Sequence, residues 1–415
     1  MDFQMGCDGL KQIAVLGHGV VGSGVMEVLE QNRGLIEKRV GSQVEVRYIL
    51  DRRQFPGLPY SDRFVTDFGV IRDDPAVEAV VEVLGGLEPA FSYARESLLA
   101  GKSVITSNKE LVARKGDVLL ALAREKGAHF LFEASVGGAI PVIEPMHRCL
   151  DANRIQQVAG ILNGTTNFIL TKMLREGCTF QDALELAQRL GYAERDPSAD
   201  VEGLDACRKI CILASLAFGS HFYPEDVPTR GIAGVKPRDA AYAARWGGAV
   251  KLIARARRAA GGRVALEVSP MLVPASSLLW GVGDVNNAVQ VTGDMAGDVI
   301  FYGRGAGKLP TASAVVSDVI TALTQEGPAP SLFWGPADPG LLLPPSEAPC
   351  QGYFRVTGLD REGLELFFPG AFFLEPLEQG EEALITAPAT QGELDVAQRA
   401  AEAAGGWVLS RFPVL

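Results

Sequence analysis

Short apolar runs alternate with stretches of helical periodicity over the first third of the chain. The apolar runs have the length and unbroken hydrophobicity of buried strands, and they lie at residues 11–16, 44–50, 79–84, 103–106 and 129–133. Helices are predicted between them at residues 23–30, 90–100 and 111–126. Because alternating strands and helices form parallel sheets, this region is predicted to be a doubly wound α/β domain.

The middle of the chain combines longer strands with helices. Strands are predicted at residues 154–162, 263–273 and 279–292, and helices at residues 180–190 and 240–258. The most apolar helix is predicted to start near Ala199 and to continue without a break to Phe218.

The last part of the chain is predicted to be a separate small segment. Residues 327–349 are rich in proline and lack a regular pattern, which is typical of a linker. Beyond them, strands are predicted at residues 353–356, 382–386 and 407–412, and a helix at residues 392–404.

A glycine-rich turn joins the first strand to the first helix. Its sequence is GHGVVG, and it comprises Gly17, Gly19, Val20, Val21 and Gly22 around His18. The first glycine permits the tight turn, the second lets the backbone approach a pyrophosphate, and the third lets helix and strand pack closely. This context favours a dinucleotide site over a plain glycine turn, with His18 as a loop residue and not a catalyst.

Residues at the carboxyl ends of the predicted strands are candidates for the same cofactor. Asp51 after the second strand can bind a ribose diol and favours NAD, whereas the adjacent Arg52 favours the 2′-phosphate of NADP, so the sequence leaves the choice open. Further candidates in such loops are Gly85, Thr106 and Lys109, although a lysine there is also compatible with an ordinary surface position.

Two further turns permit close approach of a ligand. Gly305 and Gly307 precede a long apolar helix, and a tight packing turn explains them equally well. Glu133 opens the turn EASVGGAIP, where a carboxylate and backbone carbonyls could hold a cation, but a plain loop is favoured on the residues alone.

Charged residues gather at the head of the most apolar helix. Asp205 and Lys209 are four residues apart and therefore share one face, with Glu202 close to that face and Glu194 in the loop upstream. A solvated ion pair is the ordinary explanation of such spacing. Because the rest of the helix is apolar, the pair is expected to point inward, where a lysine between carboxylates suits proton transfer.

Composition excludes several classes of protein. The 415 residues are enough for two or three domains, and 47% apolar with 21% charged residues is typical of a globular protein. A net charge of −11 argues against nucleic acid or an anionic membrane as the main partner. The sequence shows no signal peptide and no apolar run of the ~20 residues that a membrane span needs. The six scattered cysteines indicate a reduced cytoplasmic location.

Five segments together resemble the homoserine dehydrogenase family. They are GHGVVGSGV, TSNKELVA, EASVGGAIP, GILNGTTNFIL with GYAERDPSADVEGLDACRK, and YGRGAGKLPTASAVVSD, and they span about residues 11–325. The resemblance implies NAD(P)-dependent interconversion of L-aspartate 4-semialdehyde and L-homoserine, in the biosynthesis of threonine, methionine and isoleucine. It also implies a homodimer or homotetramer.

The resemblance assigns roles to residues of this chain. Lys209 is expected to be the acid–base group, acting with Lys109 and Asp205 around the substrate hydroxyl. Glu194 and Asp200, together with Asp205 and Lys109, are expected to bind the substrate or to orient the lysine. A sodium site is expected at Glu133 and the backbone of Val136, Gly138 and Ile140.

The resemblance also completes the expected domain organisation. A Rossmann-type NAD(P) domain covers residues 1–145 and is completed by helix 311–326, and an α+β catalytic and dimerisation domain covers residues 146–310. A linker covers residues 327–349, and residues 350–415 form a small, degenerate ACT-like domain. Its first helix is expected to be missing, because ELFFPGAFFLEP shows no helical stripe of normal length. Control by threonine is therefore left open.

Two other functions compete with this interpretation. Aspartate-semialdehyde dehydrogenase needs a thiolate nucleophile, and no cysteine here lies in a glycine-rich loop at a strand end. A non-catalytic NAD(P)-sensing regulatory protein would not need the cluster of Glu194, Asp205 and Lys209.

Overall fold

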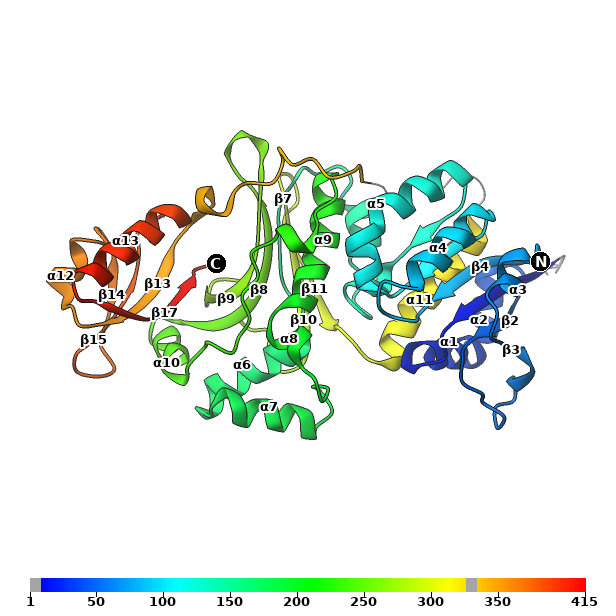
Figure 1. Cartoon of the computed structure of the whole chain (residues 1–415), viewed down its shortest axis with the longest axis horizontal. Coiled ribbons are helices and arrows are strands. Elements are labelled where there is room, and N and C mark those ends of the chain that lie inside the picture. The colour runs from blue at the N-terminus through cyan, green and yellow to red at the C-terminus, as the bar shows by residue number, and fades with distance from the viewer. Residues whose placement is uncertain (1–8, 326–333) are drawn as a thin grey trace, which may run out of the picture. The chain divides into compact units, whose positions relative to one another are not determined.

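The computed structural model describes residues 9–325 and 334–415 (Figure 1). It divides into two compact units, which are described separately below. The first unit comprises Met1–Ala152, Cys211–Tyr223 and Arg304–Ala337. The second unit comprises Asn153–Ile210, Pro224–Gly303 and Asp338–Leu415.

A parallel sheet forms the centre of the first unit, which confirms the predicted fold class. Its strand order is β3-β2-β1-β4-β5-β6, the order of a doubly wound dinucleotide-binding sheet. The strands are β1 (Leu10–Leu16), β2 (Gln43–Leu50), β3 (Phe64–Val65), β4 (Val77–Glu82), β5 (Ser103–Thr106) and β6 (Phe130–Leu131). The central strands are almost entirely apolar because both faces of the sheet are covered.

Helices of the first unit cover this sheet and include one from late in the sequence. They are α1 (Val20–Gln31), α2 (Arg33–Val40), α3 (Gly69–Asp73), α4 (Ala90–Leu99), α5 (Lys109–Lys126) and α11 (Lys308–Thr324). The apolar face of α11, including Ala312 and Val315, shares a buried core with Ile13 and Val25. A β-carbon added at Gly24 of α1 would lie 2.9 Å from the Lys308 carbonyl oxygen, so this glycine permits the close packing of α1 and α11.

An antiparallel sheet forms the centre of the second unit. Its order is β11-β10-β7-β8-β9, with strands β7 (Ile155–Ile161), β8 (Gly248–Arg258), β9 (Val264–Pro274), β10 (Asn286–Gly293) and β11 (Gly297–Arg304). The helices of this region are α6 (Gly164–Glu176), α7 (Phe180–Arg189), α8 (Ser198–Val201), α10 (Pro237–Arg245) and the first half of α9 (Leu204–Phe218), whose residues from Cys211 onward belong to the first unit.

Three element predictions for this region were wrong. The helix expected at residues 240–258 is α10 followed by strand β8, separated by Gly247 with a left-handed φ of +85°. The helix expected from Ala199 to Phe218 is broken into α8 and α9 by Gly203, whose φ is +83°. The strand expected at residues 279–292 begins only at Asn286.

The C-terminal part of the second unit has a βαββαβ order. Its four-stranded sheet runs β14-β15-β13-β17. The elements are β12 (Pro349–Cys350), β13 (Gly352–Thr357), α12 (Arg361–Glu365), β14 (Phe372–Leu374), β15 (Glu381–Ile385), β16 (Ala389–Thr390), α13 (Gln391–Ala403) and β17 (Trp407–Pro413). The expectation that the first helix is missing was wrong, although α12 has only five residues and is N-capped by Asp360.

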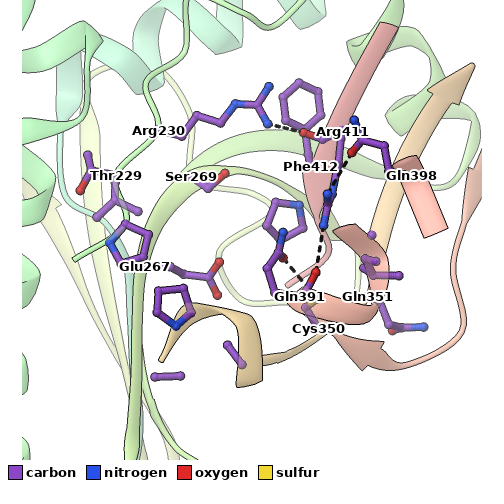
Figure 2. Close-up of a pocket in the computed structure, with 18 of the residues that line it drawn as sticks. Thr229, Arg230, Glu267, Ser269, Cys350, Gln351, Gln391, Gln398, Arg411 and Phe412 are labelled. Carbon is purple, nitrogen blue, oxygen red and sulfur yellow. Dashed lines mark hydrogen bonds between the residues drawn. The ribbon is translucent and has the colours of Figure 1, made fainter. Parts of the chain in front are cut away.

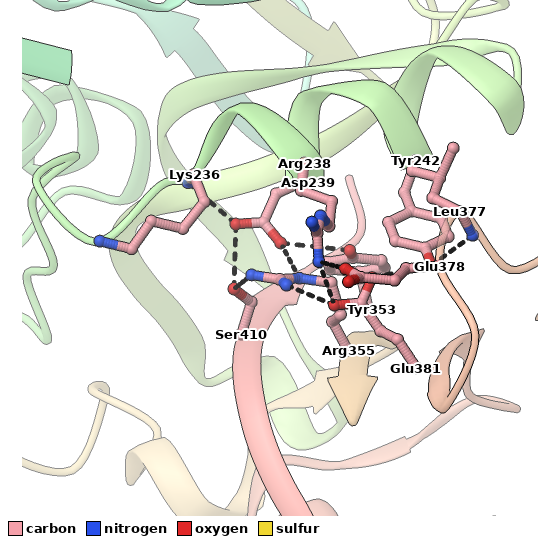
Figure 3. A network of polar contacts seen from close by, with 10 residues as sticks. All are labelled: Lys236, Arg238, Asp239, Tyr242, Tyr353, Arg355, Leu377, Glu378, Glu381 and Ser410. Atoms are coloured by element: carbon pink, nitrogen blue, oxygen red, sulfur yellow. Dashed lines mark hydrogen bonds and ion pairs between the residues drawn. The ribbon is translucent and has the colours of Figure 1, made fainter. Parts of the chain in front are cut away.

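A buried polar network joins this C-terminal part to α10 within the second unit (Figure 3). The Arg355 guanidinium donates to Asp239 at 2.8 Å and to Glu381 at 2.7 Å. The hydroxyl of Tyr242 on α10 donates to Glu381 at 2.9 Å, and the Ser410 hydroxyl donates to Asp239 at 2.9 Å. The carboxylates of two segments far apart in sequence therefore share one buried guanidinium.

Part of the expected linker falls outside the described residues, namely residues 327–333. After it, the Trp334 indole is buried and donates to Nδ1 of His221 at 2.9 Å. Across the described chain, none of the helices has both the length and the apolar character that crossing a bilayer requires.

Candidate functional site

The glycine turn of the first unit has the geometry of a phosphate cradle. Gly17 has a φ of +102°, and a β-carbon added at Gly22 would lie 2.0 Å from the Gly17 carbonyl oxygen, so neither position accepts a larger residue. A β-carbon added at Gly19 would meet nothing within 4 Å, which leaves the turn open above that residue. Gly19 is also the N-cap of α1 and makes no side-chain cap, so the backbone amides that begin α1 can receive an anion.

Asp51 lies beside this turn at the end of β2. Its carboxylate accepts from the His18 amide at 2.9 Å and from the Arg53 guanidinium at 2.8 Å. Hydrogen bonds from Arg53 hold the pKa of Asp51 well below its usual range. Both arginines are exposed, but the structure places Arg53, and not the sequence candidate Arg52, against Asp51. His18 is buried and its ring contacts the Tyr60 hydroxyl, in agreement with a loop role.

A buried carboxylate that sequence reasoning missed connects the loops after β4 and β5. Glu82 accepts from the Thr106 hydroxyl at 2.6 Å and from the Leu84 amide at 2.8 Å. Burial raises the pKa of Glu82, and the hydrogen bonds to its carboxylate oppose that shift. Glu82 therefore holds the loop that carries Gly85, through Leu84, and also holds Thr106 at the end of β5.

Asn108 extends this arrangement to Lys109. Its side-chain amide donates to the Gly86 carbonyl at 2.6 Å, and its side-chain oxygen caps α5 by accepting from the Leu111 amide at 3.1 Å. Lys109 is the first residue of α5 and is therefore positioned by this cap. Gly85, Thr106 and Lys109 thus share one fixed edge of the sheet, as the sequence predicted.

The turn that begins at Glu133 is compact and brings two carboxyl groups close together. The carboxylate of Glu133 accepts from the amides of Val142, Ile143 and Glu144 at 2.7–2.9 Å, and its own amide donates to Asp318 of α11 at 2.9 Å. Desolvation and the nearby Glu133 carboxylate raise the pKa of Asp318, and desolvation also raises the pKa of Glu133.

Gly138 lies in this turn with a φ of +57°, and a β-carbon there would lie 2.7 Å from the backbone of Gly305. The turn that begins at Glu133 is thus in contact with the turn that carries Gly305 and Gly307. Gly307 has a φ of +130° and is the N-cap of α11. Among the residues that the structure describes, no three His, Cys, Asp or Glu side chains group as metal ligands, so a cation here would depend on Glu133 and backbone carbonyls.

The lysine cluster of the second unit is buried, as its position on an apolar helix indicated. Lys209 is 6% exposed and Asp205 is 3% exposed. The Lys209 ammonium lies 3.0 Å from the Asp205 carboxylate and donates to the Leu162 carbonyl at 2.8 Å. The alternative of a solvated surface pair is therefore wrong.

Asn163 completes this cluster and was missed as a site residue. Its amide group donates to Asp205 at 3.0 Å and to Asp200 at 2.6 Å, while its side-chain oxygen caps α6. The NG dipeptide of the sequence indicated a turn, and only the fold shows that the Asn163 side chain reaches α8 and α9.

Of the other three acidic candidates near Lys209, the structure places one in the cluster and two outside it. Asp200 is half-buried on α8 and bonded to Asn163, so it belongs to the cluster. Glu194 lies in an exposed loop, where its carbonyl accepts from Gln188 at 3.2 Å. The expectation that Glu202 lies near the shared face was wrong, because Glu202 is the exposed C-cap of α8 before the break at Gly203.

A pocket of about 670 Å³ lies elsewhere in the second unit, between β9, β17 and α13 (Figure 2). Arg230, Glu267 and Arg411 are among its lining residues, and none of the predicted site residues lines it. This pocket is therefore distinct from the lysine cluster.

The glycine cradle on a Rossmann-type sheet and the buried lysine–carboxylate cluster define a nicotinamide-dependent oxidoreductase. Family models described as "Homoserine dehydrogenase, NAD binding domain" and "Homoserine dehydrogenase" match residues 17–133 and 141–320. The chain belongs to the homoserine dehydrogenase family.

Relatives of known sequence and structure agree with this assignment. The homoserine dehydrogenase of Synechocystis sp. is 47% identical over 74% of this chain and 72% of its own length. That of Pseudomonas aeruginosa is 42% identical over 85% of this chain and 83% of its own length. The crystal structure of a homoserine dehydrogenase from Thiobacillus denitrificans has a TM-score of 0.89 and 35% identity, and covers 98% of this chain and 99% of that chain.

A more distant structure includes a cofactor. A hyperthermophilic archaeal homoserine dehydrogenase in complex with NADPH has a TM-score of 0.65 and 30% identity, and covers 77% of this chain and 100% of that chain. The family assignment makes this chain an NAD(P)-dependent oxidoreductase and gives no support to the two competing functions.

Proposed function

We propose that this enzyme interconverts L-aspartate 4-semialdehyde and L-homoserine with Lys209 as the acid–base group. The observation that carries the proposal is the Lys209 ammonium, buried and held by the Asp205 carboxylate at 3.0 Å and the Leu162 carbonyl at 2.8 Å. A group that moves a proton repeatedly needs such a fixed position, because proton transfer requires hydrogen-bond distance and orientation.

The reduction adds a hydride to the aldehyde carbon and a proton to the aldehyde oxygen. The nicotinamide supplies the hydride. Lys209 donates the proton to the oxygen as negative charge develops there, and its ammonium also stabilises that charge. In the oxidation of homoserine, the neutral Lys209 amine accepts the hydroxyl proton. Asp205 and Asn163 act as positioning residues for this lysine.

The remaining candidates are proposed to bind the substrate. Asp200 and Glu194 supply negative charge for the substrate ammonium group, and Asp200 is already oriented by Asn163 at 2.6 Å. Lys109 is proposed to act on the substrate oxygen, because the Asn108 cap fixes the start of α5. The role of Lys109 is tested separately from that of Lys209, by its own substitution.

The described residues fit a dinucleotide, and we propose that NADP is accepted through Arg53. Gly17, Gly19 and Gly22 leave room for the pyrophosphate, as the added β-carbons show. The Asp51 carboxylate is already bonded to the His18 amide and to Arg53. The Arg53 side chain is 61% exposed, so its guanidinium can turn to a 2′-phosphate.

The residues also fit a monovalent cation, and sodium is proposed at Glu133 with the carbonyls of Val136, Gly138 and Ile140. Glu133 is buried, and among the described residues no cationic side chain lies within ion-pair distance of it. The compact turn and the adjacent Asp318 carboxyl group add oxygen atoms near Glu133. Activity measured in sodium, potassium and choline salts at one ionic strength tests this part.

Further expectations are proposed with the function. They are a cytoplasmic location, a homodimer or homotetramer, the domain boundaries given above and an ACT-like role for residues 350–415. The sheet order β14-β15-β13-β17 supports the ACT-like assignment.

The most direct experiment follows the ultraviolet absorbance of the reduced nicotinamide. The folded protein is mixed with homoserine and either NAD or NADP at alkaline pH. We expect reduction that depends on homoserine and is faster with NADP. No reduction with either cofactor, from protein that still binds the cofactor, would instead support the NAD(P)-sensing alternative.

A further inference from the structure

A second pocket of the second unit contains a buried lysine that the proposed mechanism does not use. The pocket has a volume of about 540 Å³, and Lys251 of β8 is one of its lining residues. Lys251 is 4% exposed. Arg175 of α6 and the loop that precedes β10 also line the pocket.

The Lys251 ammonium has only neutral hydrogen-bond acceptors. It donates to the Val282 carbonyl at 2.6 Å and to the Asn167 side-chain oxygen at 3.3 Å. Within residues 9–325 and 334–415, no carboxylate forms an ion pair with it. A buried charge without a counter-ion is unfavourable, so this site can gain from an anion.

The charges around Lys251 add to this effect. Arg175 and Asp284 are the charged groups that act on Lys251, and they pair with each other at 3.5 Å. The three groups together leave one positive charge in excess. Burial first, and Arg175 second, lower the pKa of Lys251 to about 8, whereas Asp284 opposes the shift.

The other walls of the pocket are apolar. They include Leu174, Ala249 and Trp280, whose indole is 45% exposed. Ligand sites commonly combine such walls with a few charged groups that orient the ligand. We propose that this pocket binds a small organic anion, whose acidic group pairs with Lys251 and Arg175 and whose apolar part lies against Leu174 and Trp280.

A ligand in this pocket would contact the loop that packs on α6, the helix that begins beside the lysine cluster. The loop comprising residues 282–286 accepts three hydrogen bonds from the Asn167 amide group, at 3.1–3.3 Å. A β-carbon added at Gly164 would lie 2.7 Å from the Val285 carbonyl oxygen, so loop 282–286 packs directly on the first turn of α6. The N-cap of that helix is Asn163, which bonds Asp200 and Asp205. A continuous series of contacts therefore connects Lys251, through loop 282–286 and the first turn of α6, to Asn163.

Calorimetric titration of the whole protein tests the proposal without any measurement of turnover. The ligands are benzoate and phenyl phosphate, with acetate as the analogue that lacks the apolar part and benzyl alcohol as the analogue that lacks the charge. Ionic strength is held constant because exposed charges respond to salt. We expect at least one of the two aromatic anions to bind about 10-fold more tightly than both analogues. The ratio of the two shows which acidic group is preferred.

Two variants and a matched control locate the site. Lys251→Met and Arg175→Gln should each weaken binding of the aromatic anion by about 10-fold. Lys172→Met should not, because Lys172 lies on the same helix but pairs with Glu176 at 2.7 Å outside the pocket lining. If Lys251→Met fails to fold, Arg175→Gln carries the test, since the Arg175 side chain is 63% exposed.

The pH dependence gives a separate criterion. Only the ammonium form of Lys251 pairs with an anion, and benzoate has no ionisation of its own near neutral pH, so affinity for benzoate should be nearly constant from pH 6 to 7 and should fall as pH rises through 8. Equal binding of benzyl alcohol, unchanged affinity in every foldable pocket variant, or no binding of either aromatic anion would overturn the proposal. A change in KM for homoserine when the anion is bound would show coupling between this pocket and Asn163. This kinetic measurement rests on the proposed function, whereas the binding measurements do not.

Discussion

A lysine that transfers protons has to be held in a fixed position. The Asp205 carboxylate, at 3.0 Å, and the Leu162 carbonyl, at 2.8 Å, both hold the Lys209 ammonium. Spacing in the sequence was enough to pair Lys209 with Asp205, but Leu162 and Asn163 are distant in sequence and only the fold brings them to the pair.

Replacing Lys209 by methionine removes the proton donor and keeps an unbranched apolar side chain of similar length. We expect kcat to fall about 100-fold or more, the usual size of an acid–base contribution. Cofactor affinity, measured by fluorescence titration, should stay the same, because the glycine cradle belongs to the first unit. Lys172→Met is the control, since that lysine is paired on the helix surface with Glu176. Near-normal turnover of Lys209→Met would exclude Lys209 as the acid–base group.

Cofactor preference also depends on single residues, and two neighbouring arginines provide a matched comparison. Arg53 contacts Asp51 and the His18 carbonyl, whereas Arg52 is exposed. Arg53→Ala should lower kcat/KM with NADP about 10-fold relative to NAD, because a charged hydrogen bond to the 2′-phosphate is lost. Arg52→Ala should leave the ratio unchanged. The opposite result would show that the assignment made from sequence, and not the contact seen in the structure, identifies the phosphate-binding residue.

At the scale of elements, the sequence predicted the Rossmann sheet better than the antiparallel one. Strands β1, β4 and β5 are short, mainly apolar and followed by a turn and a helix, so their pattern has one interpretation, whereas the two-residue β3 was not predicted. Strand β8 is buried along residues 248–256, and its lack of alternation made it look like a continuation of α10. A short apolar run that is buried on both faces cannot be distinguished from a helix by periodicity alone.

The site was predicted to a similar extent and for related reasons. Glycines, lysines and carboxylates in loops were visible as candidates because their residue types suggest chemistry. Glu82 was hidden as the last residue of an apolar strand, and Asn163 looked like an ordinary turn residue. Both act by hydrogen bonds to partners distant in sequence, so no local pattern could have found them.

The break between α8 and α9 is a feature of the elements that can be tested. Gly203 has a φ of +83°, and a β-carbon there would lie 3.2 Å from Thr229 and 3.3 Å from Val268. Gly203→Ala should destabilise the fold by about 1–3 kcal/mol, the range for a residue held in a rarely populated conformation, and should raise KM for homoserine because Asp200 and Asp205 flank the break. Denaturant unfolding and steady-state kinetics measure the two effects.

Gly177→Ala is the control for Gly203→Ala. Gly177 has a φ of +65° but nothing within 4 Å of an added β-carbon, so it reports the conformational cost alone. We expect Gly177→Ala to reduce stability less and to leave KM unchanged. An equal rise in KM for both variants would mean that the geometry of the break does not position the two aspartates.

At the scale of the molecule, the C-terminal part is held to α10 by charge as well as by apolar packing. Its core is formed by apolar side chains of the four-stranded sheet and of α13, including Phe354, Leu384 and Leu394. The last strand also reaches the antiparallel sheet, where the Leu415 amide donates to the Leu272 carbonyl at 2.9 Å. Between these contacts lies the network of Asp239, Arg355 and Glu381, in which one guanidinium serves two carboxylates (Figure 3).

Arg355→Met tests how far the second unit depends on that network. The variant leaves Glu381 and Asp239 buried without their guanidinium, so we expect a loss of roughly 3–5 kcal/mol in the free energy of unfolding. Arg238→Met is the control, because Arg238 also contacts Glu381, at 3.3 Å, but is largely exposed, and its loss should be much smaller.

The pH dependence of unfolding decides whether the charges, and not the shape of Arg355, are responsible. Although burial opposes ionisation, hydrogen bonds from Arg355 and Tyr242 hold the pKa of Glu381 below its usual value. A lowered native pKa stabilises the wild type above the unfolded pKa of about 4.3, and this stabilisation is lost as pH falls through the native pKa. Without Arg355, burial should raise the pKa of Glu381, so Arg355→Met should become more stable as pH is lowered from 7 to 5, while the wild type changes little. Parallel stability profiles for the two proteins over that interval would show that the guanidinium acts only by filling space.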